Sequence, residues 1–129
     1  MNIITAYTPK KVNLIDYYFD LSKRGRNRLY MDDDKLWLLY SDSTYIQISH
    51  YRKMDNELDE DEKAEIKSLL NQDYVGTIIV WTNTNKLYEL LKSTLVEKMV
   101  LDNDYGSILK IEDVKNMNFI KLKSWLNVQ

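Results

Sequence analysis

Residues that could carry out chemistry are few in this chain. It has one histidine, His50, and no cysteine in 129 residues. A triad or an imidazole acid–base pair therefore has a single candidate, and a transition-metal site would have to be built from carboxylates. No Walker loop, G-x-S-x-G or H-E-x-x-H motif is present. We therefore predict a protein that is not an enzyme and uses no metal or cofactor, with His50 at the surface of a strand.

The densest charge lies in one acidic segment. Seven acids and a single base, Lys63, occur between Asp55 and Glu65. A calcium loop aligned from Asp55 fails, because Glu60 takes the place of the central glycine and Ile66 that of the closing glutamate. Two interpretations stay open: a solvated helix face that keeps the protein soluble, and a surface that steers a basic partner.

Two further charged clusters permit other interpretations. The run Asp32–Asp34 suits a hairpin turn, with a weak divalent-ion site as the alternative. A basic patch precedes Tyr30 and could contact phosphates while the ring stacks on a base. The patch consists of Lys23, Arg24, Arg26 and Arg28.

The composition fits one globular domain, residues 1–129, with its own core. Hydrophobic residues make up 44% of the chain and charged residues 29%, and the net charge is −2. No apolar run is long enough to span a membrane, and the start lacks the order of a signal peptide, so we expect a cytoplasmic protein. With only three Gly and one Pro, most turns must be made by Asn, Asp and Ser.

The chain is organised around residues 74–81, whose β-branched, uninterrupted apolar character is typical of a central strand buried on both faces. An amphipathic helix follows, capped by Thr82 or Thr84. Its predicted apolar face comprises Leu87, Leu90, Leu91, Thr94, Leu95 and Met99.

The other segments predict an α+β fold, in which an antiparallel meander and the central strand pack against about three to four helices. Strand-like runs separated by Asp and Ser turns predict the meander at residues 28–31, 36–40 and 44–51. In its third strand, Ile46 and Ile48 share one face while Tyr45 and Tyr51 share the other. Further helices are expected at residues 14–24, 60–71, with Asp59 or Asp61 as N-cap, and 119–126, where a strand is the alternative. A short strand or irregular lead-in at residues 3–7 and a strand at 107–111 complete the prediction.

An acidic, aromatic-rich domain without a catalytic set is more easily explained as a binding module than as an enzyme. In general character it resembles bacterial immunity proteins and other small inhibitors, which neutralise toxic nucleases by covering a basic active site. That resemblance implies a basic protein partner, such as a toxin or nuclease domain. The expected contact residues are Asp55, Glu57, Asp59, Glu60, Asp61 and Glu62, with Asp32, Asp33, Asp34, Tyr45 and Tyr51 as secondary candidates.

Two functions from other classes remain as alternatives. One is a phage or mobile-element accessory protein that binds nucleic acid through the basic patch, and the other is a hydrolase that uses carboxylates with His50. The oligomeric state stays open between monomer and homodimer, because an unpaired meander edge could accept a second copy or a strand of a partner.

Overall fold

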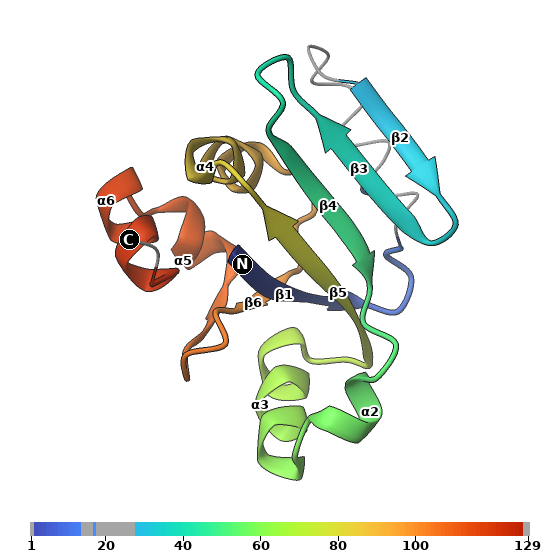
Figure 1. The fold of residues 1–129 in the computed structure, drawn as a ribbon. Coiled ribbons are helices and arrows are strands. Elements are labelled where there is room, and N and C mark those ends of the chain that lie inside the picture. The colour runs from blue at the N-terminus through green and yellow to red at the C-terminus, as the bar shows by residue number, and fades with distance from the viewer. Residues whose placement is uncertain (1, 14–16, 18–27, 128–129) are drawn as a thin grey trace.

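All strands of this computed structural model, which describes residues 2–13, 17 and 28–127, belong to one antiparallel sheet. Their order in the sheet is β2-β3-β4-β5-β1-β6-β7 (Figure 1). The strands are β1 (Asn2–Pro9), β2 (Arg28–Asp32), β3 (Lys35–Leu39), β4 (Tyr45–His50), β5 (Tyr74–Trp81), β6 (Val100–Asp102) and β7 (Ile108–Lys110). Together with the helices described below, this sheet confirms the mixed α+β class.

β5 occupies the middle of the sheet, as its composition predicted. Its predicted burial on both faces is wrong, because Ile79 and Trp81 are buried whereas Ile78 and Val80 on the other face are only half-buried. β5 pairs with β4 on one side and with β1 on the other. All eight residues of β1 pair with β5, from Asn2 opposite Trp81 to Pro9 opposite Tyr74. The alternative of an irregular lead-in is therefore wrong: β1 is an interior strand, because β6 pairs with its other edge.

The predicted meander is present as β2, β3 and β4. Ile46 and Ile48 are fully buried while Tyr45 on the opposite face is only half-buried, as the period-two pattern required. The scarcity of glycine has the expected consequence at the turns. Left-handed backbone is adopted by Asp33 at φ 51° and by Ser43 at φ 68°, and Asp is among the residues that tolerate this region.

Five helical segments lie within the described part of the chain, compared with the three to four expected. They are α2 (Met54–Glu57), α3 (Glu60–Leu70), α4 (Thr84–Ser93), α5 (Ile111–Lys115) and α6 (Phe119–Trp125). The two that were missed, α2 and α5, are too short to show a helical period. The predicted helix at residues 14–24 lies outside the described residues, except for Tyr17, which is helical and buried.

The N-cap of α3 is Asp59, one of the two residues predicted for this position. The Asp59 carboxylate accepts from the Glu62 N–H at 2.7 Å, and the Glu62 carboxylate accepts from the Asp59 N–H at 3.2 Å. This reciprocal capping box satisfies two backbone donors at the start of the helix. Asn71 ends the helix at φ 57°, which asparagine tolerates better than most residues.

The helix after β5 differs from its prediction at both ends. Its N-cap is Asn83 rather than Thr82 or Thr84, and the Asn83 side chain accepts from two backbone N–H groups. It ends at Ser93, and Thr94 is extended, so the expected continuation to Met99 is wrong. The Lys115 ammonium donates to the Thr94 carbonyl at 2.7 Å, and the chain then turns back to enter β6.

The C-terminal third contains a second correction. Ile111 starts α5 instead of ending a strand, and its N–H donates to the Met99 carbonyl at 2.9 Å. β6 was not predicted, because three residues show no period of their own. The alternative for residues 119–126 is decided in favour of a helix, α6, whose N-cap is Asn118.

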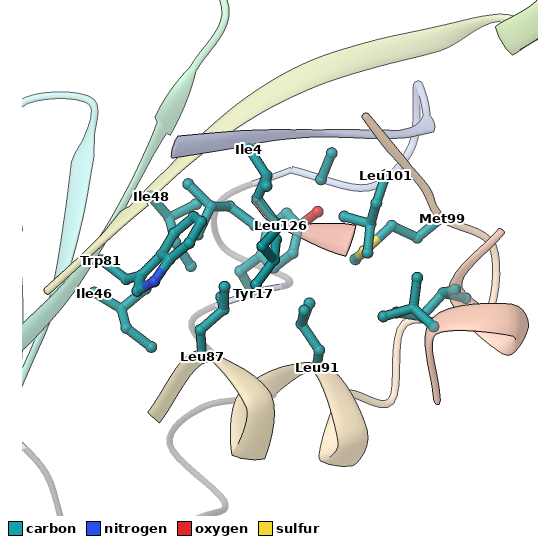
Figure 2. Packing of buried hydrophobic residues seen from close by; sticks show 14 of the residues in the cluster. Ile4, Tyr17, Ile46, Ile48, Trp81, Leu87, Leu91, Met99, Leu101 and Leu126 are labelled. Carbon is teal, nitrogen blue, oxygen red and sulfur yellow. The ribbon is translucent and has the colours of Figure 1, made fainter. Parts of the chain in front are cut away.

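The larger of two hydrophobic clusters lies on one face of the sheet. Figure 2 shows Leu87 and Leu91 of α4 pointing toward the strands that carry Trp81 and Ile46. On the opposite face, Tyr7 and Val100 pack against α3 in the smaller cluster. No described helix covers that second face over β2, β3 and β4, where Trp37 and Tyr45 are half-buried with ring centroids 5.2 Å apart.

No helix in the described residues is both long and apolar enough to cross a membrane.

We expect the larger cluster to dominate stability, which a matched leucine pair can test. Leu87 is fully buried and Leu95 is 62% exposed. Leu87→Ala should lower the free energy of unfolding by about 2–5 kcal/mol, because it removes buried methyl groups and leaves a cavity. Leu95→Ala should change it by less than about 0.5 kcal/mol. Urea denaturation followed by circular dichroism measures both, and equal losses would contradict the assignment of the core.

Candidate functional site

A close packing contact sets the position of the site. The Tyr51 N–H donates to the Gly76 carbonyl at 3.0 Å, just beyond the end of β4. A Cβ atom at Gly76 would lie 2.9 Å from the Met54 Sδ and 3.1 Å from the Tyr51 Cβ. A larger residue at position 76 would require the Met54 side chain and Tyr51 to shift, so glycine suits the close approach of the start of α2 to the sheet.

Acidic side chains from three separate elements gather around Tyr51 and the neighbouring Tyr7. We call the four carboxylates the acidic cluster. They are Glu57 in α2, Glu62 in α3, Asp102 at the end of β6 and Asp104 in the turn that follows. α2 and α3 lie together at one end of the sheet (Figure 1).

The pKa shifts show how closely these groups interact. Burial, then the hydrogen bond and negative charge of Glu57, raises the pKa of Tyr51 to about 12. Burial and the charge of Asp102 raise the pKa of Tyr7, which is 1% exposed. Loss of hydration, together with Asp102 and Glu62, raises the pKa of Asp104. The Asp104 carboxylate is therefore held near Asp102 and Glu62, whose negative charges oppose its ionisation.

Within the described residues, the acidic cluster has no neutralising cation. None of its four carboxylates lies within 4.0 Å of a described lysine, arginine or histidine nitrogen. The Asp102 carboxylate accepts the Asp104 N–H at 2.8 Å, and Glu62 accepts the N–H of Asp59. These backbone donors offset part of the repulsion but add no positive charge.

Two other acids of the predicted segment lie near lysines. Asp55 and Glu60 lie on a different side of α2 and α3, in a hollow of about 400 Å³ that Lys63 and Lys67 also line. The Lys63 ammonium is 3.6 Å from the Glu60 carboxylate and donates to the Asp55 carbonyl. The structure therefore places Asp55 and Glu60 beside lysines and Glu57 and Glu62 in the acidic cluster.

The remaining acids of the segment have other surroundings. Asp59 serves as the N-cap of α3, and its carboxylate is occupied by a backbone N–H. Asp61 is exposed in the first helical turn, where negative charge favours the helix dipole. Of the six primary candidates, only Glu57 and Glu62 join the acidic cluster.

A hollow of about 270 Å³ opens beside the acidic cluster. Ser49 and Ile78 contribute to it from β4 and β5, and Tyr51 and Glu57 line it as well. Asp34 and Arg52 also line this hollow, with the Arg52 Nε donating to the Asp34 Oδ2 at 2.7 Å. That contact lowers the pKa of Asp34. Lys35, His50 and Lys53 line the hollow too, so it presents basic as well as acidic side chains beside Tyr51.

The secondary candidates are separated by the fold. Asp34 lies close to Tyr51 at the same hollow. Asp33 forms the hairpin turn, and Asp32 pairs with Lys35 across the ladder. Tyr45 is at the opposite end of β4, roughly 20 Å along the strand from Tyr51. Tyr45 therefore belongs to the uncovered sheet face and not to the acidic cluster.

Sequence reasoning missed three members of the site. Tyr7 lies in the segment predicted as a short strand or irregular lead-in, and Asp102 and Asp104 belong to an Asp-Asn-Asp run whose residue types are typical of a turn. The turn itself is present, with the Asn103 side chain accepting from the Tyr105 N–H at 2.9 Å. These acids approach Glu62 only because β6 pairs with β1. No local signal in the chain reports that pairing.

The sites of the alternative functions are the basic patch and His50. Of the basic patch, only Arg28 is described, and it is exposed on β2. His50 is exposed at the end of β4. No group of three or more His, Asp or Glu side chains is arranged to hold a metal ion anywhere in the described ranges.

Comparison with protein-family models, with curated proteins and with solved structures finds no match to this chain.

The acidic cluster should make the protein more stable when one of its charges is removed. Because the pKa of Asp104 is raised, the folded state binds that proton more tightly than the unfolded chain does. The resulting stabilisation is complete below the ordinary pKa of 3.8 and is lost as the pH rises through the folded pKa. Asp104→Asn should therefore raise the melting temperature near pH 7, and the gain should vanish near pH 3.

Asp34→Asn is the control, because we expect it to change the melting temperature in the opposite direction. Arg52 lowers the pKa of Asp34, so its contribution is present above the ordinary pKa and is lost as the pH falls. Asp34→Asn should lower the melting temperature near pH 7. Thermal melts at the two pH values compare the variants. If Asp104→Asn is no more stable than the native chain near pH 7, the cluster is neutralised in solution.

Proposed function

We propose that this chain is a small protein-binding module that inhibits a basic partner by covering it, in the manner of an immunity protein that neutralises a toxin nuclease. The proposed contact surface is the acidic cluster with Tyr51 and the adjoining hollow. This replaces the whole acidic segment with the carboxylates that gather around Tyr51.

One observation carries the proposal: the cluster concentrates carboxylates without a described cation partner. Such an arrangement raises the free energy of the free protein, and a lysine or arginine from a partner would relieve it. A nuclease needs cationic side chains to hold its phosphate substrate. A surface that binds those cations competes directly with the nucleic acid.

The aromatic groups supply the other half of the proposed interaction. Charge attraction accelerates encounter, but buried aromatic side chains give most of the holding energy in protein interfaces. Tyr51 lines the hollow beside Glu57. Trp37 and Tyr45 extend the aromatic surface along the uncovered sheet face.

Affinity capture from a lysate of the native host tests this proposal with two matched baits. The site bait carries Glu57→Gln, Glu62→Gln and Asp104→Asn, and glutamine at position 62 can still complete the capping box. The control bait carries Glu89→Gln, Glu97→Gln and Glu112→Gln, which are exposed and remove the same charge elsewhere. We expect the native chain and the control bait to retain one stoichiometric basic protein that the site bait loses.

Kinetics with the purified partner then test the mechanism. The site variant should associate roughly tenfold more slowly at low salt and with less dependence on salt, whereas the control should be unchanged. The partner's nuclease activity should disappear at equimolar native chain. Equal capture by both baits would exclude the acidic cluster as the contact surface, and a partner that stays active when bound would exclude inhibition.

A further inference from the structure

The outer strand of the meander has a sequence that is complementary to itself. β2 reads Arg28-Leu29-Tyr30-Met31-Asp32 and lies at the end of the sheet order, with β3 as its neighbour. Reversing the strand about Tyr30 places an arginine opposite an aspartate at both ends. It also places Leu29 opposite Met31 on both sides of the centre.

We propose that β2 pairs with β2 of a second copy of this chain in an antiparallel register centred on Tyr30, so that two sheets join into one. Arg28 of each copy then faces Asp32 of the other. Both hydrogen-bonding arrangements of an antiparallel pair can be centred on a single residue, so the register is possible whichever backbone groups point outward.

The exposure of β2 supports a second copy of this chain as its pairing partner. Four of its five residues are exposed, including Tyr30 at 55% and Met31 at 42%. These are two of the more exposed large hydrophobic residues in the described chain. A second copy would place each of them against an apolar neighbour of its own kind, Tyr30 on Tyr30 and Met31 on Leu29, and cross-strand pairs of this type are favourable.

The charges support a second copy over an unrelated strand. Edge strands commonly avoid association by carrying charges of one sign, which repel an identical edge. β2 instead carries one charge of each sign at equal distances from its centre. Asp32 already pairs with Lys35 across the ladder to β3, so in the dimer its carboxylate lies between two cations.

Reciprocal charge reversal provides the test, because the proposed register places position 28 opposite position 32 at both ends. Arg28→Asp alone creates two aspartate pairs across the dimer, and Asp32→Arg alone creates two arginine pairs. Each variant should dimerise roughly tenfold more weakly than the native chain. An equimolar mixture of the two should associate again, because every charge then faces its opposite.

Sedimentation velocity of the full chain, from about 10 µM to about 1 mM, measures these equilibria, since five paired residues form a small interface that dissociates on dilution. Lys121→Asp and Asp113→Arg are the controls, because they change the net charge equally at exposed positions in α6 and α5. Both should dimerise like the native chain, and far-ultraviolet circular dichroism verifies that every variant is folded.

Two outcomes would overturn the proposal. A native chain that stays monomeric at every concentration would leave the edge to a strand of a different protein. A native dimer that survives both single reversals unchanged would place the contact on another surface. Recovery of the dimer in the mixture, together with its loss in each single variant, supports the pairing of position 28 with position 32.

Discussion

The ladder between β1 and β5 is the contact on which the rest of the structure depends. It pairs eight residues of β1 with eight of β5, which are 79 positions apart at Asn2 and Trp81 and 65 apart at Pro9 and Tyr74. β1 then pairs with β6, so it joins the meander to the C-terminal third. Residues on both faces of this ladder enter hydrophobic clusters: Ile79 faces the larger one and Tyr7 the smaller one. Closing so long a loop costs conformational entropy, which the burial on both faces offsets.

The same ladder explains why negative charges accumulate at one end of the sheet. β6 pairs with β1, with Val100 opposite Tyr7. The turn after β6 then places Asp104 near Glu62 of α3. α2 adds Glu57 because Gly76 lets it begin against β5. The repulsion around Asp104 is a cost that packing alone does not require, since the Lys63 ammonium lies 3.6 Å from the Glu60 carboxylate and shows that an acid of α3 can have a cation partner.

Prediction succeeded where a segment was long enough to show a period. The eight residues of β5, the cap of α3 at Asp59 and the meander all follow from local composition and turn chemistry. It failed where partners override the local pattern. α4 stops at Ser93 although its apolar spacing continues to Met99, because the chain must return to pair β6 with β1. Met99 is still buried, but it enters the core from a loop.

The sequence by itself determined the composition of the surface, the strand that occupies the centre and the turns that Asn, Asp and Ser would make. These depend on neighbours within a few residues, whose effects on the backbone are local. Only the tertiary structure decided which acids act together. Glu57 and Asp104 are distant in the chain, while Asp55 and Glu57, two residues apart, face different sides of α2. Electrostatic interaction depends on distance in space and on hydration, and a chain acquires both only when its strands have paired.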